Sequence, residues 1–173
     1  IDWENSSLEL SFLDHSTDLN EPLTFLETNS FDTVLATDVL EHIHEPALLF
    51  SEMSRVLKPN GHLILAVPFL YWIHDNPHDY HRYTHFMLRE FCKKNNLEVL
   101  DLEAFGGLPE IIFDLIHKGY SYFNLPLKSF FYPCFNFLGR FLSKRAFVKK
   151  MSMRSRPTFP MGYTLVARKI SKN

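Results

Sequence analysis

The sequence predicts an α/β fold with a mainly parallel β-sheet. Strand and helix signals alternate along the chain, and two compact apolar runs, 31–37 and 62–67, have the composition of buried strands. The chain has 173 residues, of which 46% are hydrophobic, enough for one domain with a sizeable core. We therefore expect a single domain over 1–173.

The predicted elements begin with a short alternating strand within 8–19, which ends near Asp18 before an Asn-Glu-Pro break. Residues 31–37 (FDTVLAT) are expected to form a strand buried on both faces. Asp38 follows this strand directly and has the side chain to cap a helical turn.

The next helix is predicted over 46–57, because Pro46 suits a first helical position and apolar residues then recur at helical spacing. The sequence KPNG at 58–61 predicts a turn. A second buried strand, 62–67, is stopped by Pro68.

The remaining elements are predicted as helix 86–95, strand 97–104, helix 109–118 and a last strand at Tyr163–Ile170. An aromatic and basic helical insert is expected at about 108–158, before the last strand.

Charge is distributed unevenly. Residues 1–114 contain all 20 acidic residues and six of the 18 basic ones, whereas residues 115–173 contain 12 basic residues and no acidic one. Such asymmetry indicates either an anionic partner or two oppositely charged halves of one fold.

Cys92 and Cys134 lie far apart and have no neighbours at zinc-finger spacing, which favours free thiols in a reducing compartment. We expect a cytoplasmic protein, because no apolar run reaches the ~18 residues that span a bilayer and no secretory signal is present. Since the chain begins at Ile1, we also expect a fragment or a processed product.

Residues 31–68 combine several spaced elements: FD-x-V in a strand, an LEH segment, a helix ending in RVLKPNG, and the strand LILAVP. This block resembles the class I S-adenosylmethionine-dependent methyltransferases, in particular the type 11 methyltransferase family. The resemblance extends from about Asp2 to Gly107 and includes 163–170 as the usual final strand. It implies a Rossmann-like methyltransferase fold with an antiparallel last strand, and S-adenosylmethionine as the cofactor.

One part of the family pattern is missing from the chain. The family's first strand and its G-x-G-x-G loop, which cradles the methionine part of the cofactor, should precede Ile1, and Gly106-Gly107 lies too late to replace them. We therefore expect an N-terminally truncated domain that binds the cofactor weakly or not at all by itself.

The resemblance assigns four residues to the nucleoside. Asp2 matches the acid that accepts the ribose hydroxyls, and Trp3 would flank the adenine; a solvated terminal Asp and a packing Trp are the alternatives. Asp18 and Leu19 match the pair that meets the adenine amino group and ring. Asp18 as a turn or cap residue, and Asp14 in its place, stay open.

The resemblance further implies that Thr37, Asp38 and Val39 line the methionine portion and the transferred methyl group, beyond the carboxyl end of a strand. Asp38 as a helix N-cap is the alternative. His42 of the LEH segment is either a wall of the reaction pocket or a structural histidine bonded to backbone.

Candidate catalytic residues come from 71–85 (YWIHDNPHDYHRYTH), where this family often places substrate contacts. We assign substrate recognition or proton acceptance to His78, Tyr80 or His81, because a histidine pKa lies near neutrality. The alternative is a structural polar network in which Arg82 pairs with an acid such as Asp79.

The same segment has four histidines spaced four, three and four residues apart, at positions 74, 78, 81 and 85. On a helix they would form a metal-binding face. Because Asp75, Asn76 and Pro77 oppose a regular helix, we predict no metal site here.

Aromatic and basic residues are interleaved over 119–150, and 134–150 has the pattern of an amphipathic basic helix. We consider three roles for it: a lid packed on the domain, contact with an anionic membrane surface or a lipid-linked substrate, and a protein-partner or homodimer face. Nucleic acid is not expected, since no recognised binding motif accompanies the charge.

These observations predict S-adenosylmethionine-dependent methyl transfer to a small-molecule or lipid-linked acceptor by the intact parent protein. The sulfonium makes the methyl group electrophilic, so the protein mainly positions the reactants, and a base is needed only for a hydroxyl or protonated amine acceptor. The alternative is a non-catalytic, degenerate module of the same fold that binds a protein partner or a membrane surface.

Overall fold

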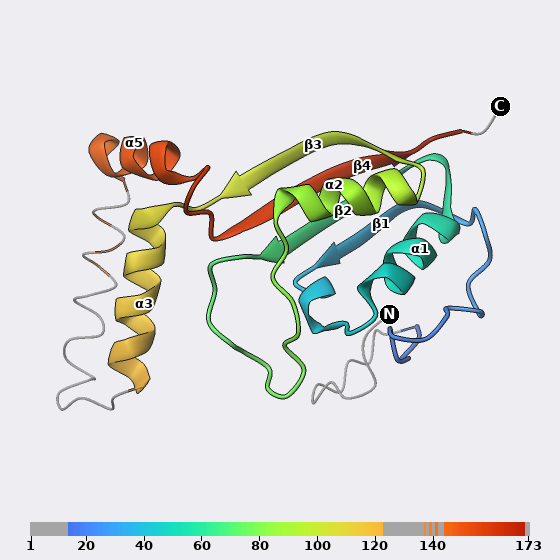
Figure 1. Ribbon diagram of the computed structural model, residues 1–173, viewed down its shortest axis with the longest axis horizontal. Coiled ribbons are helices and arrows are strands. Elements are labelled where there is room, and N and C mark those ends of the chain that lie inside the picture. The colour runs from blue at the N-terminus through green and yellow to red at the C-terminus, as the bar shows by residue number, and fades with distance from the viewer. Residues whose placement is uncertain (1–13, 123–136, 138, 140, 142–143, 172–173) are drawn as a thin grey trace. The chain divides into compact units, whose positions relative to one another are not determined.

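The computed structural model describes residues 14–122, 137, 139, 141 and 144–171 (Figure 1). Strands and helices alternate as predicted. In chain order the elements are β1 (Phe31–Thr37), the 3₁₀ helix η1 (Leu40–His42), α1 (Pro46–Val56), β2 (Leu57–Pro68), α2 (His85–Lys94), β3 (Leu97–Phe105), α3 (Leu108–Tyr122), α5 (Ala146–Ser155) and β4 (Gly162–Lys169).

The four strands form one sheet in the order β1-β2-β4-β3. β1 and β2 are parallel, with Thr33 opposite His62 and Thr37 opposite Ala66. The predicted parallel pairing of the 31–37 and 62–67 runs is therefore confirmed. Because both strands end at the same edge, the segments that follow them begin side by side.

β4 is antiparallel to β3. At one end of the pair Met161 N donates to Phe105 O at 3.0 Å, and at the other Ile170 N donates to Asn96 O at 2.9 Å, so the residue numbers run in opposite directions. The predicted antiparallel last strand is confirmed, and it is inserted between β2 and β3.

The predicted turn at 58–61 lies inside β2. Between the pairs Phe31–Leu57 and Thr33–His62, β1 has one residue and β2 has four. Asn60 has a φ of 65°, in the left-handed region that asparagine tolerates. The backbone therefore turns within 58–61, as predicted, but β2 begins to pair with β1 at Leu57, before this turn and not after it.

The core lies between the sheet and helices α1 and α2, which cover one face of it (Figure 1). Phe50 of α1 and Phe91 of α2 stack with ring centroids 5.0 Å apart. From β2, Leu63, Leu65 and Val67 are at most 1% exposed. Burial of an apolar side chain of this size stabilises the fold by about 2–3 kcal/mol, so this layer holds η1 and its neighbours in place.

The expectation that β1 is buried on both faces is wrong. Leu35 of β1 is 65% exposed and Ile64 of β2 is 39% exposed, whereas their strand neighbours Ala36 and Leu65 are buried. The described helices next to these strands cover one face, so burial alternates as in a half-covered sheet.

Two further expectations fail locally. Residues 14–19 form a single bridge at Ser16 rather than a strand, and 8–13 lie outside the described residues. A continuous helix over 134–150 is excluded, because Lys144 and Arg145 form a turn and a bend with extended backbone at Arg145, after which α5 begins.

The chain divides into two compact units. One contains residues 1–67, 73–102 and 165–173, and the other contains 68–72 and 103–164. The candidate site described below lies entirely in the first unit. A single functional domain stays a prediction. Among the helices that the structure describes, none is long and apolar enough to cross a membrane.

Candidate functional site

The backbone turns sharply where β1 ends. Asp38 has a φ of 53° and its N–H donates to Ala66 O at 3.0 Å, which ties the turn to β2. Thr37 and Asp38 are exposed and Val39 is half-buried. A non-glycine residue in the left-handed region is uncommon and marks a constrained, often functional, turn.

The alternative role of Asp38 as a helix N-cap is wrong. The residue at the N-cap position of η1 is Val39, and no side chain caps that helix. The left-handed backbone at Asp38 is incompatible with the extended conformation that an N-cap residue adopts. Asp38 is thus an exposed residue directly after β1 whose side chain does not cap η1.

Asp18 lies in a turn that is fixed to the segment after η1. Asn20 donates from both N and Nδ2 to Asp18 Oδ1 at 2.9 Å, and these bonds lower the pKa of Asp18. Asn20 Oδ1 accepts from His44 N at 2.9 Å. Asp18 and the adjacent half-buried Leu19 therefore lie close to the chain that follows β1, with the Asp18 carboxylate ionised.

Two charged side chains of α1 hold the same loop. Glu52 accepts from Leu23 N at 2.9 Å, and Arg55 donates to the carbonyl oxygens of Leu23 and Leu26, both at 2.9 Å. Glu52 and Arg55 also pair with each other at 2.9 Å. This network fixes the loop that carries Asp18 against the helix that follows β1.

The segment between β2 and α2 is hydrogen-bonded to η1. The carbonyl oxygen of Glu41 accepts from Tyr80 N at 2.9 Å and from His81 N at 3.2 Å, and Tyr83 Oη donates to Leu40 O at 2.9 Å. His42 Nδ1 lies 2.7 Å from a backbone carbonyl of this segment. The structure therefore brings the LEH segment and the HDYHRY segment together.

For His42 we considered two roles, a wall of the reaction pocket and a structural histidine bonded to the backbone. Its Nδ1 is hydrogen-bonded to the His78 carbonyl, as expected for the structural role. Its Nε2 points instead toward acidic side chains, 3.8 Å from both Glu41 and Asp75. A contact of His42 with the cofactor stays a prediction.

Of the three candidate catalytic residues, two are neighbours. His78 Nδ1 lies 3.0 Å from Tyr80 Oη, and the Tyr80 side chain is exposed. His81 packs its ring on Tyr83, with centroids 5.6 Å apart, and within the described residues its buried Nε2 has no hydrogen-bond partner. His78 and Tyr80 therefore form a hydrogen-bonded pair, and the catalytic role of all three residues stays a prediction.

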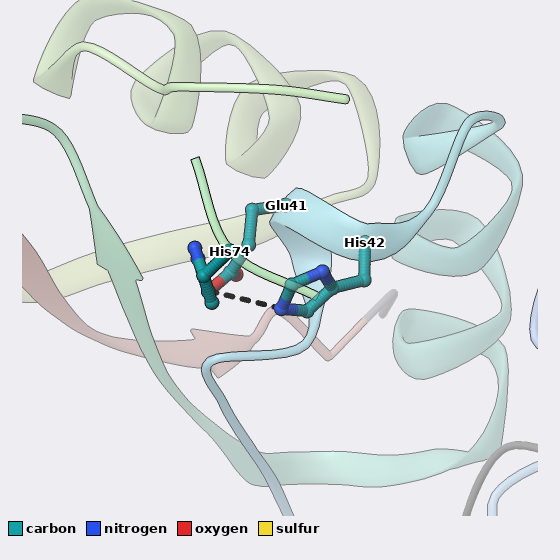
Figure 2. A group of neighbouring side chains, drawn as sticks. All are labelled: Glu41, His42 and His74. Carbon is teal, nitrogen blue, oxygen red and sulfur yellow. Dashed lines mark ion pairs between the residues drawn. The ribbon is translucent and has the colours of Figure 1, made fainter. Parts of the chain in front are cut away.

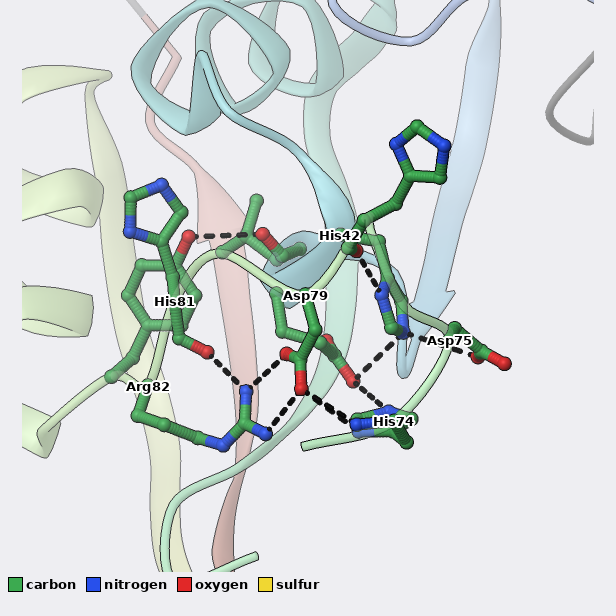
Figure 3. A network of polar contacts seen from close by, with 10 residues as sticks. His42, His74, Asp75, Asp79, His81 and Arg82 are labelled. Carbon is green, nitrogen blue, oxygen red and sulfur yellow. Dashed lines mark hydrogen bonds and ion pairs between the residues drawn. The ribbon is translucent and has the colours of Figure 1, made fainter. Parts of the chain in front are cut away.

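The predicted pairing of Arg82 with Asp79 is confirmed (Figure 3). Arg82 Nη2 donates to Asp79 Oδ2 at 2.8 Å, and the other carboxylate oxygen accepts from Nη1. Asp79 also accepts from His74 N at 2.9 Å. The Arg82 guanidinium holds the pKa of the buried Asp79 carboxyl well below its usual range.

The helical metal face formed by the four histidines is excluded, because 71–84 contains no helix. Of these histidines, His74 turns toward Glu41 and Asp79 instead, 3.9 Å and 3.3 Å away. The break at Asp75-Asn76-Pro77 was correctly read from the sequence.

Glu41 is the site residue that sequence reasoning missed. Its side chain is fully buried, and in the part of the chain described here neither carboxylate oxygen has a hydrogen-bond partner. Burial raises the pKa of Glu41. The signal was a lone acid between Leu40 and Ile43, both at most 3% exposed. Asp2 and Trp3 lie outside the described residues.

Comparison with known proteins relates the chain to methyltransferases. Residues 5–65 match the family model described as "Methyltransferase domain". An S-adenosylmethionine-dependent methyltransferase from Mesorhizobium loti is similar in structure, with a TM-score of 0.55, 13% identity, and coverage of 90% of this chain and 68% of that one. A search of curated proteins finds no match.

Two other similar structures are a cyclase and a complex with a methyltransferase activator. The [4+2]-cyclase SpnF has a TM-score of 0.55 at 20% identity, with 91% of this chain and 56% of that chain covered. A structure solved as a complex with the Haloferax volcanii Trm112 methyltransferase activator has a TM-score of 0.51 at 15% identity, with 91% and 61% covered. The chain thus spans less than two-thirds of these proteins, and at such identities the likeness shows the fold.

Proposed function

We propose that the intact protein transfers a methyl group from S-adenosylmethionine to a small-molecule or lipid-linked acceptor. The match of residues 5–65 to the methyltransferase domain family and the fold shared with an S-adenosylmethionine-dependent methyltransferase support this proposal. The observation that carries this proposal is the parallel pairing of β1 with β2. With it, the turn at 37–39 and residues 73–85, which come after these two strands, are proposed to line the edge of the sheet where α/β sheets bind their ligands.

The residues at this edge fit the nucleoside end of the cofactor. The ionised Asp18 carboxylate offers an acceptor to the adenine amino group, since Asn20 occupies one of its two oxygens. The carboxylate of the exposed Asp38 would stabilise the sulfonium charge of a cofactor bound beyond β1. The bound cofactor supplies an electrophilic methyl group. Thr37 and Val39 would line the methionine portion of the cofactor next to this group.

His78 and Tyr80 are the groups proposed to act on the acceptor. A hydrogen bond of 3.0 Å between the His78 imidazole and the Tyr80 hydroxyl lets the pair orient an acceptor and accept its proton. Both lie on the segment that η1 holds in place through the Glu41 carbonyl. Their contribution is positioning and proton removal, the two tasks that methyl transfer to a hydroxyl or amine leaves to the protein.

Fold alone does not fix the reaction, since a cyclase shares it. The test is therefore isothermal titration of S-adenosylhomocysteine into this chain and into the full natural gene product. We expect saturable binding by the full product and weak or no binding by residues 1–173 alone, because the chain contains no G-x-G-x-G loop. Absence of binding by the full product would overturn the proposal.

Variants localise the site. Asp18→Asn should lower the affinity about tenfold, the effect of one hydrogen bond to a charged group. Asp32→Asn is the matched control, because Asp32 is an exposed acid at the opposite end of β1 that pairs with Lys58. Equal affinities for the two variants would remove Asp18 from the cofactor site.

The missing glycine loop favours one alternative, a degenerate module that binds a protein partner or a membrane surface. One similar structure comes from a complex with the Trm112 methyltransferase activator, which is a precedent for a protein partner on this fold but not for the loss of catalysis. A full product that binds no S-adenosylhomocysteine yet pulls down a partner at defined stoichiometry would favour it. The membrane contact through 134–150, a homodimer and the cytoplasmic location stay predictions.

A further inference from the structure

Glu41 has a buried carboxyl group without the hydrogen-bond donors that normally stabilise a buried carboxylate. Its side chain has no exposed surface, and neither oxygen accepts a hydrogen bond from any residue that the structure describes. A buried carboxylate in this state is unfavourable unless it is protonated, paired or bound to a cation.

Two imidazoles face this carboxylate. His42 Nε2 lies 3.8 Å and His74 Nε2 3.9 Å from Glu41 Oε1. One ligand atom from each of the three residues lies within 4.8 Å of the other two (Figure 2). These separations are too long for hydrogen bonds, and movements of about 1 Å would bring all three atoms within bonding distance of one ion.

Each imidazole has an acceptor oxygen beside its other nitrogen. His42 Nδ1 lies 2.7 Å from the His78 carbonyl, which only accepts, so Nδ1 is the donor. His74 Nδ1 lies 3.3 Å from Asp79 Oδ2, and Arg82 keeps that carboxylate ionised. In the neutral rings the Nε2 atoms therefore carry lone pairs.

In this tautomer neither imidazole can donate from Nε2 to Glu41, which agrees with the absence of a hydrogen-bond partner for both carboxylate oxygens among the described residues. A backbone carbonyl or a carboxylate bonded to the remote nitrogen is also the support that metal-binding histidines receive in proteins. A cation held by the three atoms would compensate the buried Glu41 carboxylate.

We propose that Glu41, His42 and His74 bind a divalent transition-metal ion, with Zn²⁺ the best match to the ligand set. Two imidazoles and one carboxylate suit zinc and its neighbours, whereas Mg²⁺ and Ca²⁺ prefer oxygen ligands throughout. Three protein ligands leave one position of a tetrahedral ion open, as catalytic zinc sites do. This inference rests on the three side chains and not on the proposed methyl transfer.

The decisive experiment uses the wild-type chain. After EDTA treatment and dialysis, we expect Zn²⁺ titration to give one saturable equivalent, while Mg²⁺ gives none. Diethyl pyrocarbonate, mapped by mass spectrometry, should then modify His42 and His74 less in the zinc-bound chain, while the exposed His44 reacts equally in both states. No saturable equivalent, or equal modification of His42 and His74 with and without zinc, would overturn the proposal.

Cobalt provides a second readout that does not depend on variants. Co²⁺ in place of Zn²⁺ should give the intense visible bands of a four- or five-coordinate ion. Weak octahedral bands would instead indicate loose surface binding and contradict the site. Both measurements are made without any methyl donor, so failure of the proposed methyl transfer leaves them unaffected.

Variants then assign the ligands. Glu41→Gln and His74→Ala should each weaken zinc binding by about a hundredfold or more, since loss of a supporting partner alone costs 10–100-fold. His44→Ala is the control, as a histidine close in sequence whose side chain is 55% exposed. Circular dichroism verifies that each variant is folded. Unchanged zinc affinity in folded Glu41→Gln or His74→Ala would overturn the assignment.

Discussion

His42 Nδ1 donates to the carbonyl oxygen of His78 across 2.7 Å, and this bond joins the segment after β1 to the segment after β2. The two residues are 36 positions apart in sequence. Together with the two amides that donate to the Glu41 carbonyl, the bond makes the HDYHRY segment part of the sheet's carboxyl edge rather than a detached loop.

The first prediction is that His42→Phe loosens this segment while the core stays intact. Phenylalanine keeps the ring but has no donor, and the loss of one net hydrogen bond is worth about 1 kcal/mol. Amide exchange at Tyr80 and His81 should accelerate about fivefold, measured by hydrogen–deuterium exchange. His44→Phe serves as the control, and equal exchange in both variants would contradict the structural role of His42.

The second prediction concerns the buried ion pair. Asp79→Asn should lower the free energy of unfolding by about 2–3 kcal/mol at pH 7, because it removes the carboxylate charge that pairs with Arg82, whose side chain is 23% exposed. Urea unfolding measures the loss. In a double-mutant cycle with Arg82→Gln, the two effects should be less than additive; additive effects would show that the pair does not couple.

The same variant has a defined pH dependence. Since the pKa of Asp79 is depressed in the folded protein, its contribution is complete above the unfolded value of about 3.9 and is lost only as the pH falls toward the folded value. The difference between wild type and Asp79→Asn should therefore be constant from pH 7 to about 5 and shrink below 4. Asp32→Asn, an exposed control, should show little difference throughout.

The strand and helix pattern was predictable because it depends on local signals. The two apolar runs predicted β1 and the second half of β2. Pro46 correctly marked the start of α1, and Pro68 the end of β2. The turn motif KPNG also predicted the break at Asn60 inside β2. The sequence did not predict that this turn lies within a paired strand, because strand pairing depends on the partner strand as well as on the segment itself.

The site was predictable only in part. Asp38 and His42 were proposed from the motif that contains them, and the Asp79–Arg82 pair was predicted from charge and proximity. Glu41 was missed because the LEH segment drew attention to His42 alone, and only the return of the segment that contains His74 shows that a second histidine faces Glu41. Contacts between residues more than 30 positions apart leave no periodic pattern to read.

The third prediction is that Cys92 is chemically protected. It is 1% exposed, and burial raises the pKa of its thiol to about 11. In a Cys134→Ser background at pH 8, labelling by Ellman's reagent should be at least about a hundredfold slower than in guanidinium chloride, because the thiolate fraction falls by roughly that factor. Labelling at the unfolded rate would show that α2 opens readily.

The final prediction is that Glu41→Gln stabilises the metal-free protein. Burial raises the pKa of Glu41 in the folded state, so ionising it costs folding free energy at any pH above its unfolded value of about 4.3. In buffer with EDTA at pH 8, the variant should be more stable by about 1–3 kcal/mol, and the gain should vanish near pH 4, where both states bind the proton. Glu45→Gln, at a 64% exposed position, is the control.

With zinc present, the wild type should be more stable than Glu41→Gln, because the bound ion stabilises only the wild type. A variant less stable than wild type at pH 8 without metal would mean that protonated histidines already neutralise the carboxylate.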